Sequence, residues 1–552
     1  MAQKRKYPMG IQSFESLRMD GYVYVDKTPL IYKMITEGKP YFLSRPRRFG
    51  KSLLVNTLAA VFEGRRDLFE AFTTKQGIEQ PQLFIARTDW EWEKYPVLRF
   101  DFSKDLLGIG QLDLLIDKML ERYEQQYGIT PATPATFLRL DTLVRKAHED
   151  TGKRVVLLVD EYDKMMLHSI GDEEMAADVK ARFKNLFSPL TDLDEHLQFV
   201  FITGISKFSQ MGVFSTINQL KNISMMPTFE SICGITEEEL TTTMHPDIEL
   251  LAEKRKETYD ETLAELKRMY DGYHFSRGMT DIYNPFSMMR ALDSGDIDKY
   301  WFESATPSAL IEILRQMPPL EINDVDDVDC DSDAFNQAFD SYNAPLPVLY
   351  QSGYLTIKHY DEDIDMYTLG FPNVEVRTGF SGCLYSYVTN TTPDNRDRNV
   401  LKKAYKMFER NDDLPTFIEA IKTFYSGVLV PPKLGGYRGL NKGNTDAGSD
   451  PQPPNSGGFD ALLYTLLTAF GADVRAEEPT AKGCSDITLF MPRSIYVMEL
   501  KYNDTAEAAL EQINRKGYAD KYALDGRPVT KVGIAFSSEE RNITDWSSEP
   551  KA

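Results

Sequence analysis

The sequence predicts an α/β protein with a parallel sheet near its N-terminus, a helical middle region and a second α/β domain at its C-terminus. Three observations support this. Apolar runs alternate with helical patterns in the first half, as in a parallel sheet with helices on both faces. The next part is mainly helical and charged, and a last apolar unit follows a Pro- and Gly-rich stretch. The predicted divisions are 1–240, 241–345, a mixed region 346–428, a flexible linker 429–458 and a domain 459–545.

The elements of the first half follow from hydrophobic periodicity. Strands are expected where apolar residues run without alternation, because both faces of a parallel sheet are covered. These runs are 40–44, 97–102, 154–159 and 198–203. Helices are expected between them and beyond them, at 52–63, 106–126 and 248–270. A return to helix and strand is expected at 348–358.

A tight basic loop joins the first strand to the first helix and ends in Gly50-Lys51-Ser52. This pattern is typical of a phosphate-binding loop (P-loop), in which main-chain N–H groups at a helix N-terminus face phosphate oxygens. The lysine reaches the β- and γ-phosphates, and the serine hydroxyl binds Mg²⁺. The predicted ligands are therefore ATP and Mg²⁺. The loop residues expected to contact them are Arg48, Phe49, Gly50, Lys51 and Ser52.

A pair of carboxylates follows the strand at 154–159. Asp160 is expected to hold Mg²⁺ together with Ser52, and Glu161 is expected to act as the general base on the attacking water. The carboxyl ends of strands in open parallel sheets are also where ligands bind. The alternative is an ordinary polar strand end followed by a turn.

Two further features near the loop stay open. Thr203 ends the next strand and either contacts the nucleotide as a sensor of the γ-phosphate or simply ends that strand in a Thr-Gly turn. Arg45 occupies the place of the usual first glycine of the loop, with Arg47 and Arg48 beside it. These arginines either supply transition-state charge, within one chain or to a neighbouring subunit of a homo-oligomer, or form a solvated basic loop.

The last unit carries a second constellation. A helix is expected at 459–470, strands at 486–490, 495–501 and 531–536, and another helix at 505–522. Glu499 and Lys501 are two positions apart, so they project from one face of their strand, and Asp486 starts the adjacent strand. Two carboxylates can hold Mg²⁺ while a lysine stabilises or deprotonates the attacking water, which is the arrangement of a metal-dependent phosphodiesterase. The alternative is an exposed strand face with one salt bridge.

Several short motifs together resemble those of the bacterial AAA-ATPase-like proteins. They are residues 22–28, 45–52, 160–163, 203–209, 270–275 and 283–287. Arg45 in place of the first glycine is typical of that family. The resemblance implies an N-terminal P-loop ATPase domain and a C-terminal nuclease-like domain of the PD-(D/E)XK superfamily, with the restriction-endonuclease-like fold. Asp486, Glu499 and Lys501 match the positions of that motif, and Gln512 and Tyr518 match its later Gln and Tyr.

The resemblance implies an ATPase whose nucleotide state regulates Mg²⁺-dependent cleavage of DNA or RNA. Two departures leave an alternative open, namely an ATP-switched binding or regulatory module with a catalytically inactive nuclease fold. Relatives often place a glutamate on the first helix of this domain, where this chain has residues 456–459, and an arginine where Cys484 stands. A carboxylate from elsewhere, such as Glu477 or Glu478, could replace that glutamate.

Composition and residue spacing indicate the cellular compartment and argue against several kinds of metal and disulfide site. The net charge is −21, and the four cysteines are scattered, which argues against a disulfide framework or a zinc site. No signal peptide or membrane span is visible, so a cytoplasmic protein that does not enter a membrane is expected. The six histidines have no ligand spacing, and the role of residues 270–275 is open. The aspartate-rich run 321–333 is expected to be a solvated loop rather than a Ca²⁺ site.

Overall fold

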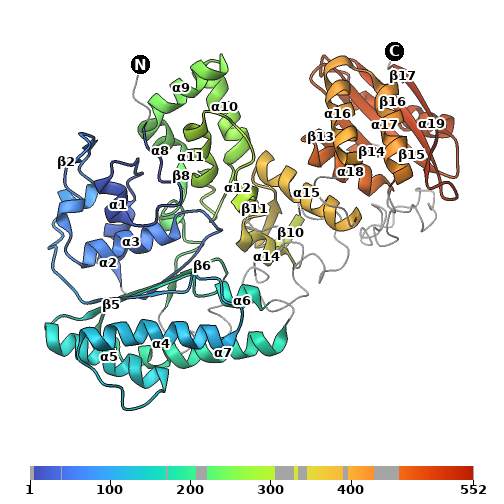
Figure 1. The fold of residues 1–552 in the computed structure, drawn as a ribbon. Coiled ribbons are helices and arrows are strands. Elements are labelled where there is room, and N and C mark those ends of the chain that lie inside the picture. The colour runs from blue at the N-terminus through green and yellow to red at the C-terminus, as the bar shows by residue number, and fades with distance from the viewer. Residues whose placement is uncertain are drawn as a thin grey trace. The chain divides into compact units, whose positions relative to one another are not determined.

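The computed structural model describes residues 5–38, 40–169, 172–206, 220–304, 328–332, 345–389, 396–427, 459–480 and 482–550. These residues form two compact units (Figure 1). The first holds the described residues up to 304 together with those at 328–375, and the second holds those at 376–550. The division falls within the predicted mixed region 346–428. The predicted linker 429–458 lies outside the described residues.

The first unit is built on a five-stranded sheet whose strands all run parallel, in the order β4-β5-β6-β1-β7. The strands are β1 (Pro40–Ser44), β4 (Val97–Asp101), β5 (Val155–Asp160), β6 (Leu197–Gly204) and β7 (Lys221–Asn222). The four long strands match the predicted runs, and the α/β prediction is confirmed. The two-residue edge strand β7 has no apolar run, so hydrophobic periodicity could not reveal it.

Helices cover both faces of this sheet, α2 and α3 on one and α4, α5 and α7 on the other (Figure 1). The helices of this part are α1 (Phe14–Met19), α2 (Thr28–Glu37), α3 (Lys51–Phe62), α4 (Ile109–Gln126), α5 (Thr136–Thr151), α6 (Lys164–His168) and α7 (Glu173–Phe187). A small hairpin joins β2 (Phe72–Thr73) and β3 (Glu79–Gln80). Helix α4 begins later than predicted because the residues before it form a loop that lines a cavity.

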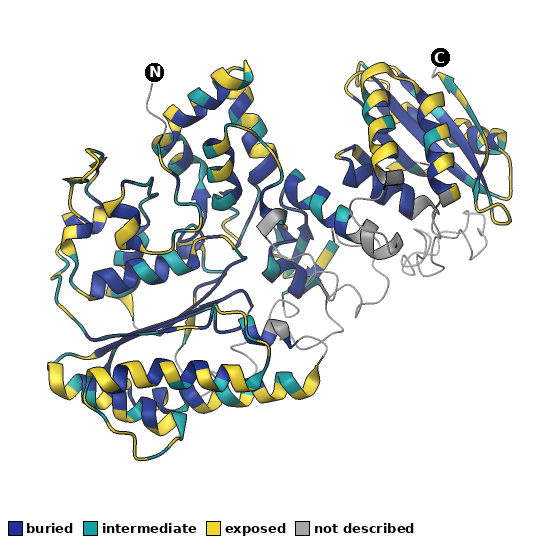
Figure 2. Cartoon of the chain, viewed as in Figure 1, coloured by how far each residue is buried: buried dark blue, intermediate teal, exposed yellow. Residues whose placement is uncertain are grey.

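The centre of the sheet is the core of this unit. All six residues of β5 are buried, which Figure 2 shows as a dark-blue strand. Burying an aliphatic side chain of this size stabilises the fold by about 1.5–3 kcal/mol relative to leaving it exposed. The apolar run therefore places β5 in the middle of the sheet. It also fixes the position of Asp160 at the end of β5 and of Glu161 after it.

The middle region is helical, but the helix predicted at 248–270 is two helices. The first ends at Arg255, Lys256 follows with φ at 60°, and Thr258 caps the second in a capping box with Glu261. The capping pattern was readable in the sequence, whereas periodicity alone continued across it. The helices here are α8 (Glu237–Thr243), α9 (His245–Arg255), α10 (Tyr259–Tyr270), α11 (Pro285–Ser294), α12 (Trp301–Ser304) and α14 (Pro345–Ser352).

Two small sheets complete the first unit. Strands β8 (Ile235–Thr236) and β9 (Ile282–Tyr283) pair, and β10 (Val328–Asp331), β12 (Met366–Gly370) and β11 (Thr356–Asp361) form an antiparallel sheet. The acidic run was expected to be a solvated loop, and for its described part this was wrong. Residues 328–331 pair with β12 and bury Cys330, so the alternating aspartates are the solvent face of a strand.

The second unit carries a mixed sheet in the order β13-β14-β15-β16-β17, in which only β15 and β16 run parallel. Its strands are β13 (Asp473–Thr480), β14 (Gly483–Phe490), β15 (Ile495–Tyr502), β16 (Val529–Ser537) and β17 (Asn542–Pro550). The two outer strands, β13 and β17, were not predicted, because both are rich in polar and charged residues.

Its helices are α16 (Arg396–Asn411), α17 (Leu414–Gly427), α18 (Phe459–Ala469) and α19 (Ala506–Lys516), and α15 (Val374–Thr389) crosses from the first unit into the second. Helix α19 is the crossover between the parallel strands. It ends at Gly517, which has φ at 67°, rather than continuing to residue 522 as predicted. Every helix in the described ranges is too short or too polar to cross a membrane.

Candidate nucleotide site and paired-carboxylate site

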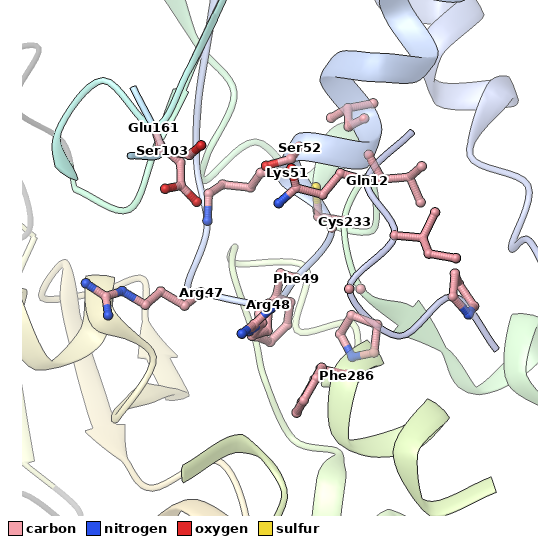
Figure 3. Close-up of a pocket in the computed structure, with 18 of the residues that line it drawn as sticks. Gln12, Arg47, Arg48, Phe49, Lys51, Ser52, Ser103, Glu161, Cys233 and Phe286 are labelled. Atoms are coloured by element: carbon pink, nitrogen blue, oxygen red, sulfur yellow. The ribbon is translucent and has the colours of Figure 1, made fainter. Parts of the chain in front are cut away.

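A cavity of about 940 Å³ lies in the first unit where the loop between β1 and α3 meets the carboxyl ends of the strands (Figure 3). Most of its lining comes from seven stretches that belong to four parts of the chain. These are the N-terminal stretch at 8–12 and 23–27, the loop and helix start at 47–54, the strand ends at 103–107 and 161–164, and the middle region at 232–235 and 285–289. The predicted loop residues Arg48, Phe49, Gly50, Lys51 and Ser52 all line this cavity.

The loop has the backbone that the sequence predicts. Gly50 adopts φ of 93° as the residue that precedes α3, and Lys51 and Ser52 begin the helix. Lys51 is buried, and its ammonium group donates to the carbonyl oxygens of Arg45 (2.9 Å) and Pro46 (3.0 Å). Burial lowers the pKa of this ammonium, opposed by the negative charges of Glu161 and Asp160.

Arg45 is a structural anchor in this fold. Its guanidinium is buried and donates to the carbonyls of Ser44 and Ser224, at 2.9 and 2.7 Å, and of Phe229 and Glu230, both at 3.2 Å. It also lies 4.2 Å from the ring centre of Phe275. Both terminal nitrogen atoms, Nη1 and Nη2, thus donate to the chain itself, and Nε is buried without a hydrogen-bond partner among the described residues. Neither an arginine finger nor a solvated loop describes this side chain.

The other two arginines differ from Arg45. Arg48 is exposed, has φ of 69°, and lies 5.1 Å from the ring centre of Phe286. The side chain of Arg47 points away from Lys51 (Figure 3), and its carbonyl accepts a hydrogen bond from the Trp301 indole. Phe49 packs against Tyr273 and Phe275, with ring centres 4.8 and 5.4 Å apart. The motif at 270–275, whose role the sequence left open, therefore supports the loop.

Asp160 ends β5 beside the start of α3. It is 6% exposed, and its Oδ1 has no hydrogen-bond partner among the described residues. Burial raises the pKa of Asp160 to about 6, while a hydrogen bond from Ser52 and the charge of Lys51 act in the opposite direction. It lines a separate polar cavity of about 220 Å³ with Asp101 and Arg99. A buried carboxylate oxygen beside a serine hydroxyl is a donor pair that suits Mg²⁺.

Glu161 and Asp163 line the large cavity together. Glu161 has φ of 51°, in the left-handed region that is uncommon for a residue other than glycine. Figure 3 shows its carboxylate on the same side of the cavity as Lys51. The Oδ2 of Asp163 accepts from the amides of Ile205 (2.9 Å) and Ser206 (2.6 Å) and from the Ser206 hydroxyl (2.6 Å). Asp163 therefore ties the ends of β5 and β6 together.

Thr203 lies apart from the cavity. It is completely buried, its hydroxyl donates to the carbonyl of Leu43 at 2.9 Å, and it does not line the large cavity. This placement matches the reading of Thr203 as the end of a strand, because its hydroxyl joins β6 to β1.

Sequence reasoning missed the N-terminal part of the cavity. Met9, Ile11, Val23 and Val25 line one side of it, and the buried Lys27 donates to both carboxylate oxygens of Glu239 nearby, at 2.7 and 2.6 Å. Their signal was present, since residues 22–28 are one of the motifs that carry the family resemblance. Periodicity gave no sign that this stretch folds back onto the loop.

In the second unit, Asp486 of β14 and Glu499 of β15 lie on neighbouring strands. Asp486 Oδ2 accepts from the Leu500 amide at 2.8 Å. Glu499 is completely buried, and its Oε1 accepts from Gln512 and, at 3.5 Å, from the Lys501 ammonium. Lys501 also donates to Gln512 Oε1 at 2.6 Å. Glu499, Lys501 and Gln512 thus form one hydrogen-bonded network, and Asp486 lies on the neighbouring strand.

Close packing of α19 on the sheet makes this network possible. Gly533 pairs with Glu499 in the parallel ladder, and a Cβ atom at Gly533 would lie 2.1 Å from the Ala506 carbonyl. Only glycine allows the helix to approach this closely. The helix then sets Gln512 over Glu499, and Tyr518 beyond it contacts the Gln512 amide at 3.5 Å.

The carboxylate expected to complete this site is not Glu478. Its Oε1 accepts from Lys521 and, at 3.4 Å, from Arg475, and the side chain of Glu477 lies outside what the structure describes. Across the described ranges, no group of three or more His, Cys, Asp or Glu side chains is placed to hold a metal ion. Asp486 and Glu499 fit Mg²⁺ as oxygen donors, with water and phosphate oxygens as the remaining ligands, which Mg²⁺ commonly keeps.

Two family models match the parts of the chain that hold these residues. Residues 8–214 match the family model described as predicted AAA-ATPase, and residues 457–546 match that of the PD-(D/E)XK nuclease superfamily. The chain is 32% identical over 559 residues to an uncharacterized protein in the vnfD 5′ region of Azotobacter chroococcum mcd 1, and the match covers 99% of each chain. No solved structure matches the chain.

Proposed function

Because this chain belongs to the family of predicted AAA-ATPases that carry a C-terminal PD-(D/E)XK nuclease superfamily domain, we propose that it binds and hydrolyses ATP to regulate a nuclease-like domain that acts on nucleic acid. The observation that carries the proposal is the meeting of Lys51, Ser52 and Glu161 in one cavity, with Asp160 at the end of β5 beside Ser52. The apolar side chains of the N-terminal stretch offer a surface for the adenine base.

We assign separate roles in ATP hydrolysis to Lys51, Ser52, Asp160 and Glu161. The main-chain N–H groups at the start of α3 and the Lys51 ammonium bind the phosphates. Ser52 and Asp160 would hold Mg²⁺, which supplies charge neutralisation on the phosphate oxygens. Glu161 orients the attacking water and accepts its proton.

The second unit provides groups for phosphodiester hydrolysis. Asp486 and Glu499 would hold Mg²⁺, which when bound lowers the pKa of a water ligand. Lys501, fixed by Gln512, contacts the reacting phosphate or stabilises the attacking water. The substrate class is DNA or RNA.

Nucleotide turnover by the full chain tests the first half of the proposal. We expect Mg²⁺-dependent ATP hydrolysis by the wild type and its loss in Lys51→Ala. Glu161→Gln keeps nucleotide binding and lowers the hydrolysis rate by about 100-fold or more, because the amide cannot accept the proton. Glu149→Gln, at an exposed position on α5, serves as the control. ATP hydrolysis that survives Lys51→Ala contradicts the assignment of this site.

Cleavage of DNA and RNA with Mg²⁺ or Mn²⁺, with and without ATP, tests the second half. We expect cleavage that depends on the metal ion, responds to ATP, and is lost in Asp486→Asn. Asp545→Asn, an exposed position on β17, is the matched control. Wild-type cleavage no faster than that of Asp486→Asn excludes the nuclease assignment.

A second candidate is an ATP-switched binding or regulatory module with an inactive nuclease fold. The observation that favours it is the complete burial of Glu499, whose Oε1 is engaged by Gln512 and Lys501. Under this reading, wild type and Asp486→Asn bind nucleic acid equally and neither cleaves it. A binding titration together with the cleavage assay on both proteins separates the two candidates, because only the first predicts cleavage by the wild type.

A further inference from the structure

The phosphate loop of the first unit is held by residues far from it in sequence. One of them is also hydrogen-bonded to the first turn of α15, the helix that continues into the second unit. Trp301, the first residue of α12, donates its indole N–H to the Arg47 carbonyl at 3.2 Å. Its main-chain amide donates to Glu375 Oε1 at 2.7 Å. Glu375 lies in the first turn of α15 and is the last residue of the first unit.

Trp301 has little freedom to move independently of the loop. It is 1% exposed and packs against Tyr354, with ring centres 5.3 Å apart. Gly353, with φ of 86°, fits against both Pro46 and Trp301, and a Cβ atom there would lie 2.6 Å from the Pro46 ring. A shift of residues 46–47 therefore acts on Trp301 through a hydrogen bond and through direct packing.

We expect nucleotide binding to alter this part of the loop. The Lys51 ammonium is bonded to the carbonyls of Arg45 and Pro46, the residues that precede the carbonyl held by Trp301. A phosphate bound by the ammonium competes with those two carbonyls for its N–H groups, because a hydrogen bond to an ionised acceptor is stronger than one to a carbonyl. The change in hydrogen bonding thus arises one residue away from the Trp301 contact.

We propose that Trp301 is a positioning residue that couples the conformation of the phosphate loop to helix α15. Helix α15 continues into the unit that carries Asp486 and Glu499. This inference rests on the proposed function, because it names the route by which the nucleotide regulates the nuclease-like domain. The two hydrogen bonds of Trp301, one on each side, are the physical link.

Hydrogen exchange of the full chain tests this route, with a non-hydrolysable ATP analogue, Mg²⁺ and pH 8. We expect the analogue to change exchange by about twofold or more in peptides covering 374–389. Trp301→Phe keeps an aromatic ring but lacks the N–H donor, so it binds the analogue about 3- to 10-fold more weakly. At saturating analogue it no longer shows the change at 374–389.

The matched control is Trp90→Phe. The indole N–H of Trp90 has no hydrogen-bond partner among the described residues, so its removal leaves the response intact. Glu375→Gln is a second variant of nearly the same shape. Its neutral amide oxygen binds the Trp301 amide more weakly than a carboxylate does, and we expect it to reduce the response by about half.

Two results overturn the inference, namely a full response at 374–389 in Trp301→Phe or an equal loss in Trp90→Phe. Failure of the wild type to bind the analogue contradicts the proposed function instead. In that event, hydrogen exchange of the variants without the analogue tests whether Trp301 couples the two segments. Trp301→Phe must then exchange faster than Trp90→Phe at both 45–52 and 374–389, and unchanged exchange at either segment rejects the coupling.

Discussion

The ammonium group of Lys51 lies 2.9 Å from the carbonyl oxygen of Arg45, on the loop that precedes its own helix. The lysine thus closes the phosphate loop on itself. Arg45, in turn, is fastened by its guanidinium to the segment that follows β7. Arg45, which stands where such loops usually have a glycine, therefore anchors this loop.

Replacing Lys51 by Met separates binding from folding. We expect nucleotide affinity to fall by about 10- to 100-fold, because the charged donor to the phosphates is gone. Ligand-free thermal stability should stay unchanged or rise, since the variant no longer buries an ammonium whose desolvation is costly. Titration with a fluorescent ATP analogue and thermal unfolding measure the two effects. Lys146→Met on α5 is the control, and a large loss of ligand-free stability contradicts the expectation.

Arg45→Met and Arg47→Met form a matched pair. The first variant removes the donors to four buried carbonyls, and we expect it to lower the free energy of unfolding by about 3 kcal/mol. The second changes a side chain that points away from Lys51 (Figure 3) and should alter stability by no more than about 0.5 kcal/mol. Urea unfolding of both proteins checks this. Equal effects would show that Arg45 is not the anchor.

Stability should depend on pH through Glu375. Burial raises the pKa of Glu375 to about 7 from its ordinary 4.5, opposed by its hydrogen bonds and by the charge of Lys299. The buried phenols of Tyr270 and Tyr273 also face it. The native state therefore keeps a proton that the unfolded chain releases, so stability falls as pH rises from about 4.5 to 7.

The variant Glu375→Gln isolates this effect, because its amide does not titrate. We expect the stability of the variant relative to wild type to increase between pH 5 and pH 8 by about 3 kcal/mol. Melting temperatures at the two pH values provide the measurement. A difference that does not vary with pH excludes Glu375 as the titrating group.

Metal binding at the second unit can be tested without nucleic acid. Asp486 and Glu499 lie on adjacent strands, so a divalent ion bound between them favours the folded state. At a Mn²⁺ concentration of 100 times its dissociation constant, we expect a gain of about 2.7 kcal/mol. The gain should vanish in Asp486→Asn and persist in Asp545→Asn. An equal gain in both variants places the ion elsewhere.

Much of the fold was predictable because the four long strands of the first sheet coincide with mainly apolar runs. Gly50-Lys51-Ser52 and the carboxylates after β5 gave the candidate site for the same reason, since each stands at the end of a predicted element. The predictions were wrong where polar residues form part of an ordered element or of a helix boundary. A loop was predicted where β10 lies, and a single helix was predicted across the capping box at Thr258.

The roles of individual side chains were harder to predict. Arg45 could have been a finger or a solvated residue, and Thr203 a sensor or a strand end, because sequence spacing does not fix the partner of a hydrogen-bonding group. Only contacts with distant residues, such as Ser224 for Arg45 and Leu43 for Thr203, distinguish these cases.

The sequence by itself determined the α/β class, the phosphate loop at Lys51 and the paired carboxylates at Asp486 and Glu499. Those features are local, since periodicity and motif spacing act over a few residues. Only the tertiary structure decided that Arg45 anchors the loop and that Trp301 joins it to Glu375. These are long-range hydrogen bonds between buried groups, and their partners are selected by how the chain packs rather than by neighbouring residues.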